Sequence, residues 1–221
     1  MRRYLLILPL VATLSACMDI PQAQAPRRQV VRQSTTTFNP EPEYRQCLSE
    51  LGAQHASFTP LPDRYFGTGC STVETVQLSS LRGDTAALSL TNLGPVTCNV
   101  ANTFASWARY GVDRAAEQIL GSRLARIETF GSYSCRNVAG TGRRSGHATA
   151  NAIDVSAFVL ADGRRISVLD GWNGGTPAER RFLRVVHASA CKRFGTTLGP
   201  DYNTAHANHF HVEADGADFC R

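Results

Sequence analysis

Cysteine placement restricts the fold of this chain more than any other feature of its sequence. One of the seven cysteines, Cys17, ends a short apolar segment that follows two arginines, which is the layout of a secretory signal. The other six are at least 23 residues apart, so no C-x-x-C zinc or redox motif is present. An even number of cysteines in an exported chain predicts three disulfides without choosing their pairing. These cysteines are Cys47, Cys70, Cys98, Cys135, Cys191 and Cys220.

The N-terminal segment indicates where the protein is delivered. Leu14-Ser15-Ala16-Cys17 resembles the bacterial lipobox, which implies that residues 1–16 are a lipoprotein signal peptide and that Cys17 is acylated. The apolar run is too short for a permanent membrane span. Met18 and not an aspartate directly follows Cys17, so we expect anchoring at the outer rather than the inner membrane of a bacterial envelope, facing the periplasm. The alternative is a plain secretory signal whose cysteine falls there by chance.

Residues 17–45 and 46–221 differ in composition. The first range is rich in Pro, Gln, Arg and Thr without helical or strand periodicity, which predicts a lipidated cysteine followed by a flexible tether. The second has enough apolar residues for one core, so we expect one domain and a monomer. The formal charge of +5 comes from scattered arginines without a dense basic helix, which argues against nucleic-acid binding.

Hydrophobic periodicity predicts an α+β domain, in which helices pack on a small antiparallel sheet and disulfides tie the elements together. Asp113 is the expected N-cap of the second helix, and Thr176 opens a capping box. In the strand over 152–160, strict alternation places Asp154 and Phe158 on the same face. The expected elements are helices over 98–111 (ending at Gly111), 113–120 and from Thr176 to Gly195, and strands over 123–130, 152–160, 165–169 and 209–213.

Histidine clustering points to a metal site. Three of the six histidines are His206, His209 and His211, and residues two apart on a strand project from the same face. His147 enters the strand that carries Asp154, so a bend between them can bring an imidazole and a carboxylate to one ion. Histidine and carboxylate ligands suit zinc, and three protein ligands leave a fourth position for water.

Two motifs connect these residues to known families. Ser145-Gly-His-Ala-Thr-Ala-Asn-Ala-Ile-Asp154 resembles the S-x-H-x-x-G-x-A-x-D motif of zinc D-alanyl-D-alanine peptidases. His209-Phe210-His211 resembles the H-x-H of penicillin-insensitive murein endopeptidases and lysostaphin-type enzymes. The stretch from about Cys47 to Arg221 resembles the bacterial extensin-like C-terminal domain family, with Gly-Ser-Tyr-Ser-Cys-Arg, His-Ala-Thr-Ala-Asn-Ala-Ile-Asp-Val-Ser and Leu-Gly-Pro-Asp-Tyr-Asn as landmarks. The resemblance implies a fold like that of the hedgehog and D-Ala-D-Ala peptidase domains.

The resemblance also implies roles for individual residues. His147, Asp154 and His211 correspond to the ligands of one Zn²⁺, and His209 to the neighbouring catalytic histidine. Arg136 corresponds to an arginine that holds the substrate or the developing oxyanion. Two departures stand out: Ala150 replaces the glycine of the peptidase motif, and the Glu-x-x-His pattern that supplies a general base is absent. The base would then be His209, with Glu213 or His206 as weaker candidates. His206 is also expected to orient a ligand, and Ser145 is expected to be a turn or capping residue rather than a nucleophile.

These observations predict an exported lipoprotein that acts as a zinc-dependent hydrolase of peptidoglycan peptide bonds, of the D,D-peptidase or endopeptidase type. Its expected partners are peptidoglycan or muropeptides, and the membrane through the lipid at Cys17. The alternative is a non-catalytic lipoprotein that keeps the peptidase fold and binds the wall or supports the envelope. The missing glutamate base favours this alternative.

Overall fold

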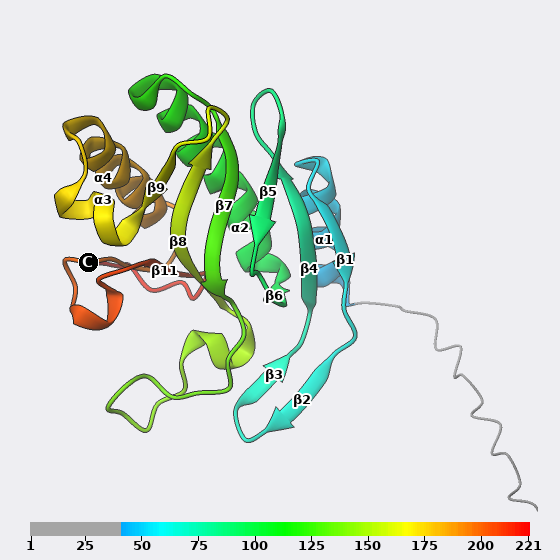
Figure 1. Ribbon diagram of the computed structural model, residues 1–221. Helices are drawn as coiled ribbons and strands as arrows, with labels where there is room; N and C mark the ends of the chain where they lie inside the picture. The colour runs from blue at the N-terminus through cyan, green and yellow to red at the C-terminus, as the bar shows by residue number, and fades with distance from the viewer. Residues whose placement is uncertain (1–40) are drawn as a thin grey trace, which may run out of the picture. The chain divides into compact units, whose positions relative to one another are not determined.

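A mixed sheet of ten strands organises residues 41–221, the part of the chain that the computed structural model describes (Figure 1). The helices are α1 (Pro42–Ala53), α2 (Cys98–Trp107), α3 (Val168–Gly174) and α4 (Pro177–Cys191), with π-helical turns η1 (Ala108–Asp113) and η2 (Ala116–Leu120) and 3₁₀ turns η3 (Gly146–Thr149) and η4 (Thr204–His206). The strands are β1 (Ser57–Pro60), β2 (Arg64–Gly67), β3 (Cys70–Thr72), β4 (Thr75–Arg82), β5 (Ala87–Thr91), β6 (Val96–Thr97), β7 (Leu124–Gly131), β8 (Ala152–Leu160), β9 (Arg165–Ser167), β10 (Thr196–Leu198), β11 (Phe210–Glu213) and β12 (Phe219–Cys220). The predicted α+β class is confirmed.

Strand order in the main sheet is β1-β4-β5-β7-β8-β11-β10-β12, with β6 also paired to β4 and β9 to β8. The β5–β7 and β10–β12 pairs are parallel and the other pairs are antiparallel. β2 and β3 form a separate hairpin that projects from one end of the sheet (Figure 1). The centre of the main sheet is β7-β8-β11, whose strands come from distant parts of the chain.

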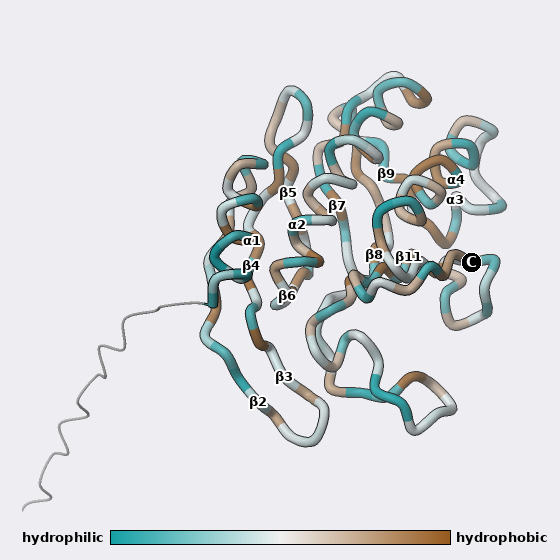
Figure 2. The backbone as a smooth tube through the Cα atoms, turned by 180° about the vertical axis from the view of Figure 1, so that it is seen from behind, coloured by the Kyte–Doolittle hydropathy of each residue, from teal (hydrophilic) through white to brown (hydrophobic). Residues whose placement is uncertain are grey.

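Helices α1 and α2 lie against one face of the sheet, as both the front and the back view show (Figures 1 and 2). Aromatic side chains from α2, β8, α4 and β11 fill the core beneath the helices and are fully buried. They include Trp107, Phe158, Phe182 and Phe210. The Trp107 indole donates a hydrogen bond of 3.0 Å to the carbonyl of Val186 in α4, so its one polar atom is satisfied inside the core.

Three disulfides join the six cysteines, as the sequence predicted: Cys47–Cys98, Cys70–Cys135 and Cys191–Cys220. The first ties α1 to the start of α2, and the second ties β3 to the segment after β7. The third ties the end of α4 to β12. Each bridge closes a loop of 29 to 65 residues, so each stabilises the fold mainly by restricting the unfolded chain.

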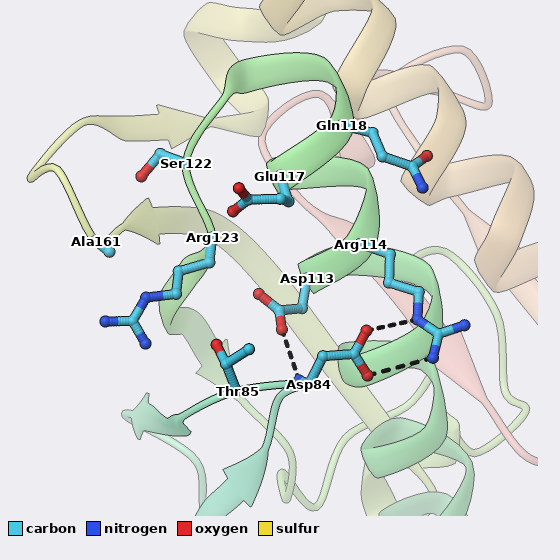
Figure 3. A pocket seen from close by; sticks show the side chains of 9 residues that line it. All are labelled: Asp84, Thr85, Asp113, Arg114, Glu117, Gln118, Ser122, Arg123 and Ala161. Carbon is cyan, nitrogen blue, oxygen red and sulfur yellow. Dashed lines mark hydrogen bonds and ion pairs between the residues drawn. The ribbon is translucent and has the colours of Figure 1, made fainter.

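The region after α2 differs from the prediction of two separate helices. Gly111 does not end the first helix, because the chain continues through η1 and this glycine packs against Trp107. Asp113 is not an N-cap: it lies within η1, and its buried carboxylate accepts hydrogen bonds from the backbone N–H groups of Asp84 (2.9 Å) and Leu124 (2.8 Å) (Figure 3). Gly121 ends η2 with a φ of 68°, as expected for a helix-terminating glycine.

The alternation predicted for β8 is interrupted by a bulge. Glu128 of β7 pairs with Ala157, but the next residue, Thr129, pairs with Val155, so Ser156 is an extra residue in β8. A bulge shifts the side-chain alternation by one residue. Phe158 therefore packs into the core with Val155 and not on the face of Asp154. Ile153 and Val155 before the bulge and Phe158 and Leu160 after it therefore all face the core, while Asp154 faces the other side of the sheet.

Asp113 gives a direct test of this packing. Asp113→Ala leaves two backbone N–H groups without an acceptor, and we expect the free energy of unfolding to fall by about 2 kcal/mol or more, measured by urea denaturation. Glu117→Ala is the matched control, because Glu117 lines the same surface cavity without a buried role, and its effect should stay within about 0.5 kcal/mol. Equal effects of the two substitutions would contradict the structural role of Asp113.

Candidate metal centre

Three side chains from three separate elements converge at one end of the β8–β11 pair. His147 lies on η3, Asp154 on β8 and His211 on β11, where the antiparallel register places His211 opposite Asp154. The Asp154 carboxylate is 3.0 Å from Nε2 of His147 and 2.8 Å from Nδ1 of His211, and these two nitrogens are 3.1 Å apart. One donor atom from each residue lies within 4.8 Å of the other two. Two imidazoles and one carboxylate in this arrangement fit a zinc ion.

A short capped turn presents His147. The Ser145 hydroxyl accepts a hydrogen bond from the backbone N–H of His147, and Ala150 ends the turn in the left-handed conformation, with φ 55°. Glycine adopts this conformation without steric cost, which explains why the related motif has glycine at this position. Ser145 is thus a capping residue, one of the two roles that the sequence left open for it.

Hydrogen bonds on the outer side of each imidazole fix which nitrogen faces the centre. Nδ1 of His147 is 2.7 Å from the carbonyl of Ser132, and Nε2 of His211 is 2.6 Å from the carboxylate of Glu213. These contacts orient the rings so that Nε2 of His147 and Nδ1 of His211 are the nitrogens that face Asp154 and would bind a metal ion once they are deprotonated. Carbonyl and carboxylate partners of this kind orient histidine ligands in metal sites.

Gly146 provides the space for the Glu213 carboxylate. A Cβ atom at position 146 would lie 2.5 Å from the carboxyl carbon of Glu213 and 2.7 Å from its Oε1. Any larger residue would therefore displace the carboxylate that holds His211. Sequence inspection missed this role because Gly146 and Glu213 are far apart in the chain and meet only after β8 and β11 pair.

The metal-free centre has a characteristic charge distribution. Burial raises the pKa of Asp154, but hydrogen bonds from His147 and His211 outweigh burial and hold the pKa well below its usual range. Burial lowers the pKa of His211, but hydrogen bonds to the Asp154 and Glu213 carboxylates outweigh it and raise the pKa to about 9. In the metal-free protein at neutral pH, a proton on His211 lies between two carboxylates, at the place where a cation would bind.

His209 lies beside the three ligands but does not belong to the set whose donor atoms converge. Its Nε2 is 3.4 Å from Asp154, while its Nδ1 is 2.8 Å from the Asn208 side-chain oxygen, which holds the Nδ1–H tautomer. Burial is the main cause that lowers the pKa of His209. A neutral imidazole with a free Nε2 directed at the centre can accept a proton there. Asn208 was not identified from the sequence, although its position directly before His209 was a usable signal.

His206 and Arg136 lie at the edge of the centre. The His206 ring is 5.1 Å from that of His209, its Nδ1 is 2.7 Å from Asn203, and burial is the largest cause that lowers its pKa to about 4. Arg136 is exposed, and its backbone carbonyl accepts a hydrogen bond from the backbone N–H of Ser145, the residue that caps the His147 turn. The structure thus places His206 and His209 beside the three predicted ligands, with Glu213 bound to His211.

Two other features of the described residues are not part of this centre. His187, Cys191 and Cys220 form a second cluster of possible ligands, but the disulfide removes both thiols. A cavity of about 780 Å³ lies where β7 begins and β8 ends (Figure 3). The candidate metal centre lies at the opposite end of these strands. The most buried acid in its wall, Asp113, already binds backbone N–H groups, so this cavity does not offer a comparable site.

The close approach of Gly146 and Glu213 leads to a prediction about how tightly the site binds zinc. We expect Gly146→Ala to weaken zinc binding about tenfold or more, measured by competition with a chromophoric chelator, because it displaces the partner of His211. Gly142→Ala is the matched control, since no atom lies within 4 Å of a Cβ at that position in the same loop. Unchanged affinity in a folded Gly146→Ala protein would show that the Glu213 contact does not support metal binding.

The family comparison agrees with the resemblance noted in the sequence. The model of the extensin-like protein C-terminus matches residues 45–221, a range that contains all six disulfide cysteines and all the residues of the metal centre. No curated protein and no solved structure matches the chain. Since the match covers most of the sequence, the chain belongs to the family of the extensin-like protein C-terminus.

Proposed function

We propose that this protein is a zinc-dependent hydrolase of peptidoglycan peptide bonds, related to the zinc D-alanyl-D-alanine peptidases and carried on an exported lipoprotein. The observation that carries the proposal is the convergence of His147, Asp154 and His211 with His209 beside them but outside the ligand set. Three protein ligands with a free fourth position are typical of catalytic zinc, whereas structural zinc has four. The oriented imidazoles further support a metal-binding role.

When bound, zinc supplies Lewis-acid chemistry, since it polarises a carbonyl and lowers the pKa of water toward neutrality. His209 then has the position and protonation state of a general base, because its Nε2 faces the centre and Asn208 holds the other nitrogen. Arg136 supplies positive charge near the same point and can offset the negative charge of a tetrahedral intermediate. His206 supports His209 from the solvent side.

The location is also a proposal. Cys17 and the signal peptide lie outside the described residues, as does the tether up to residue 40. Three disulfides fit an oxidising compartment such as the periplasm, which is where peptidoglycan is found. Among residues 41–221, no helix has the length and apolar character needed to cross a bilayer.

One observation favours a non-catalytic alternative. Glu213, the carboxylate nearest to the centre apart from Asp154, is occupied by His211 at 2.6 Å, so the general base must be a histidine. If His209 does not serve as that base, the domain would bind zinc and wall peptides without cleaving them. The two functions differ in the consequence of removing His209 while the metal remains bound.

The ligand and base assignments can be separated experimentally. We expect the protein, produced in an oxidising compartment, to contain about one zinc per chain by mass spectrometry and to release peptides from purified muropeptides. His147→Ala should lose both zinc and hydrolysis, whereas His209→Gln should keep zinc and lose at least about 100-fold in rate. A folded, zinc-supplied parent without metal would overturn the proposal, and a wild-type rate in His209→Gln would overturn the assignment of the base.

The raised pKa of His211 predicts opposite pH trends for metal binding and for metal-free stability. Zinc must displace the His211 proton, so its apparent affinity should rise about tenfold per pH unit from pH 7 and level off near the pKa of about 9. In the metal-free protein this histidine stabilises the fold fully below its unfolded pKa of 6.5, and the contribution is lost as the pH rises through about 9.

Chelator competition and urea denaturation at matched pH values measure these two trends. Affinity that does not change with pH would show that His211 is neutral before zinc binds.

A further inference from the structure

The loop beside the metal centre has an unusual charge content. From Thr129 to Ile153 the chain contains three arginines and no acidic residue, although 18 acidic residues are distributed over the whole sequence. The arginines are Arg136, Arg143 and Arg144, and all three are exposed. We name residues 132–145 the arginine loop. Its positive charge is not balanced by acids within this segment.

The arginine loop is held in place next to the ligands at both of its ends. The carbonyl of Ser132 binds His147, and Ser145 caps the turn that carries His147. Near the same two ends, the Cys70–Cys135 disulfide and two hydrogen bonds from Arg144 to the Thr68 carbonyl (2.7 and 3.1 Å) attach the loop to the β2–β3 hairpin. The loop and the hairpin lie at the same end of the sheet in both views (Figures 1 and 2).

Neighbouring carboxylates do not neutralise the loop. Asp154 lies among the candidate ligands and Glu213 binds His211, so the two carboxylates of the centre are already occupied. In contrast, Asp84 and Glu128 elsewhere on the surface each bind two arginines. Arginine pairing is therefore common in this protein but absent from the arginine loop.

Two of the three guanidinium groups are free to bind a ligand. Arg144 is occupied by Thr68 and Asn137, but within residues 41–221 the side chains of Arg136 and Arg143 form no hydrogen bond or ion pair. Arg136 also acts on the centre electrostatically: after burial and the other histidines, its charge contributes to the lowered pKa of His206. A cationic rim next to a metal centre attracts anionic ligands into it.

We propose that the arginine loop binds carboxylates of the substrate, so that the preferred substrate is an acidic peptide with free carboxylates near the cleaved bond. This inference rests on the proposed function and narrows its substrate class. Guanidinium groups bind carboxylates in bidentate geometry, and two free arginines match the few carboxylates of a short peptide. An anionic membrane surface or a polyanion calls for a larger basic cluster than this loop provides.

The test compares two peptides on the full-length, zinc-loaded protein with His209→Gln, so that binding is measured without turnover. One probe is a fluorescent peptidoglycan stem peptide with free carboxylates, and the other is the same peptide with its side-chain carboxylates amidated. We expect the free-carboxylate peptide to bind about fivefold or more tightly at about 50 mM salt, and the difference to shrink at about 500 mM salt.

Arginine substitutions assign the effect to the loop. In the same background, Arg143→Gln should weaken binding of the free-carboxylate peptide about threefold or more and leave the amidated peptide unchanged. Arg181→Gln on α4 is the matched control, because Arg181 is an exposed arginine outside the loop, and it should change neither affinity.

Equal binding of the two peptides, or a preference that Arg143→Gln leaves intact, would overturn the inference. So would an effect of Arg143→Gln on binding to anionic vesicles but not to peptides. Failure of the proposed function has a different signature: the wild-type protein would cleave neither peptide, whereas the binding preference would persist. Cleavage of both peptides with equal efficiency and affinity would leave the proposed function standing and reject the role of the arginine loop.

Discussion

The pairing of β11 with β8 is the interaction on which the metal centre depends. Antiparallel register sets Asp154 opposite His211, and buried Phe210 and Val212 hold that register because a shift by one residue would move them out of the core. The bulge at Ser156 then shifts the alternation of β8. Ile153 and Val155 before the bulge and Phe158 and Leu160 after it all pack into the core, so the bulge moves the core-facing positions from odd to even numbers while Asp154 stays on the other face.

Much of this organisation was predictable from local patterns. Alternation identified β11, the capping box at Thr176 identified α4, and clustered histidines pointed to side chains that the fold brings together. These signals are local because hydrophobic periodicity, helix capping and side-chain chemistry each depend on a few residues that are neighbours in the sequence. The disulfide count followed from the even number of cysteines, but the pairing did not, because it depends on which distant elements become neighbours.

The features that the sequence did not reveal are long-range contacts. Neither strand pattern announced the bulge at Ser156, because it appears only in the pairing of β7 with β8. Aspartate often caps helices, yet the Asp113 carboxylate instead accepts hydrogen bonds from two backbone N–H groups that the fold brings together. The space that Gly146 leaves for the Glu213 carboxylate is another long-range contact of this kind. In each case, tertiary structure overrides a sound local expectation.

The Cys70–Cys135 bridge has a consequence for the order in which the protein matures. It fixes the segment that carries the outer partner of His147, and it joins residues 65 positions apart. Before oxidation only the backbone at its two ends ties this segment covalently to the rest of the domain, so in a reduced chain the Ser132 carbonyl is less well fixed against His147. Formation of this bridge would therefore precede the final positioning of His147 beside Asp154 and His211.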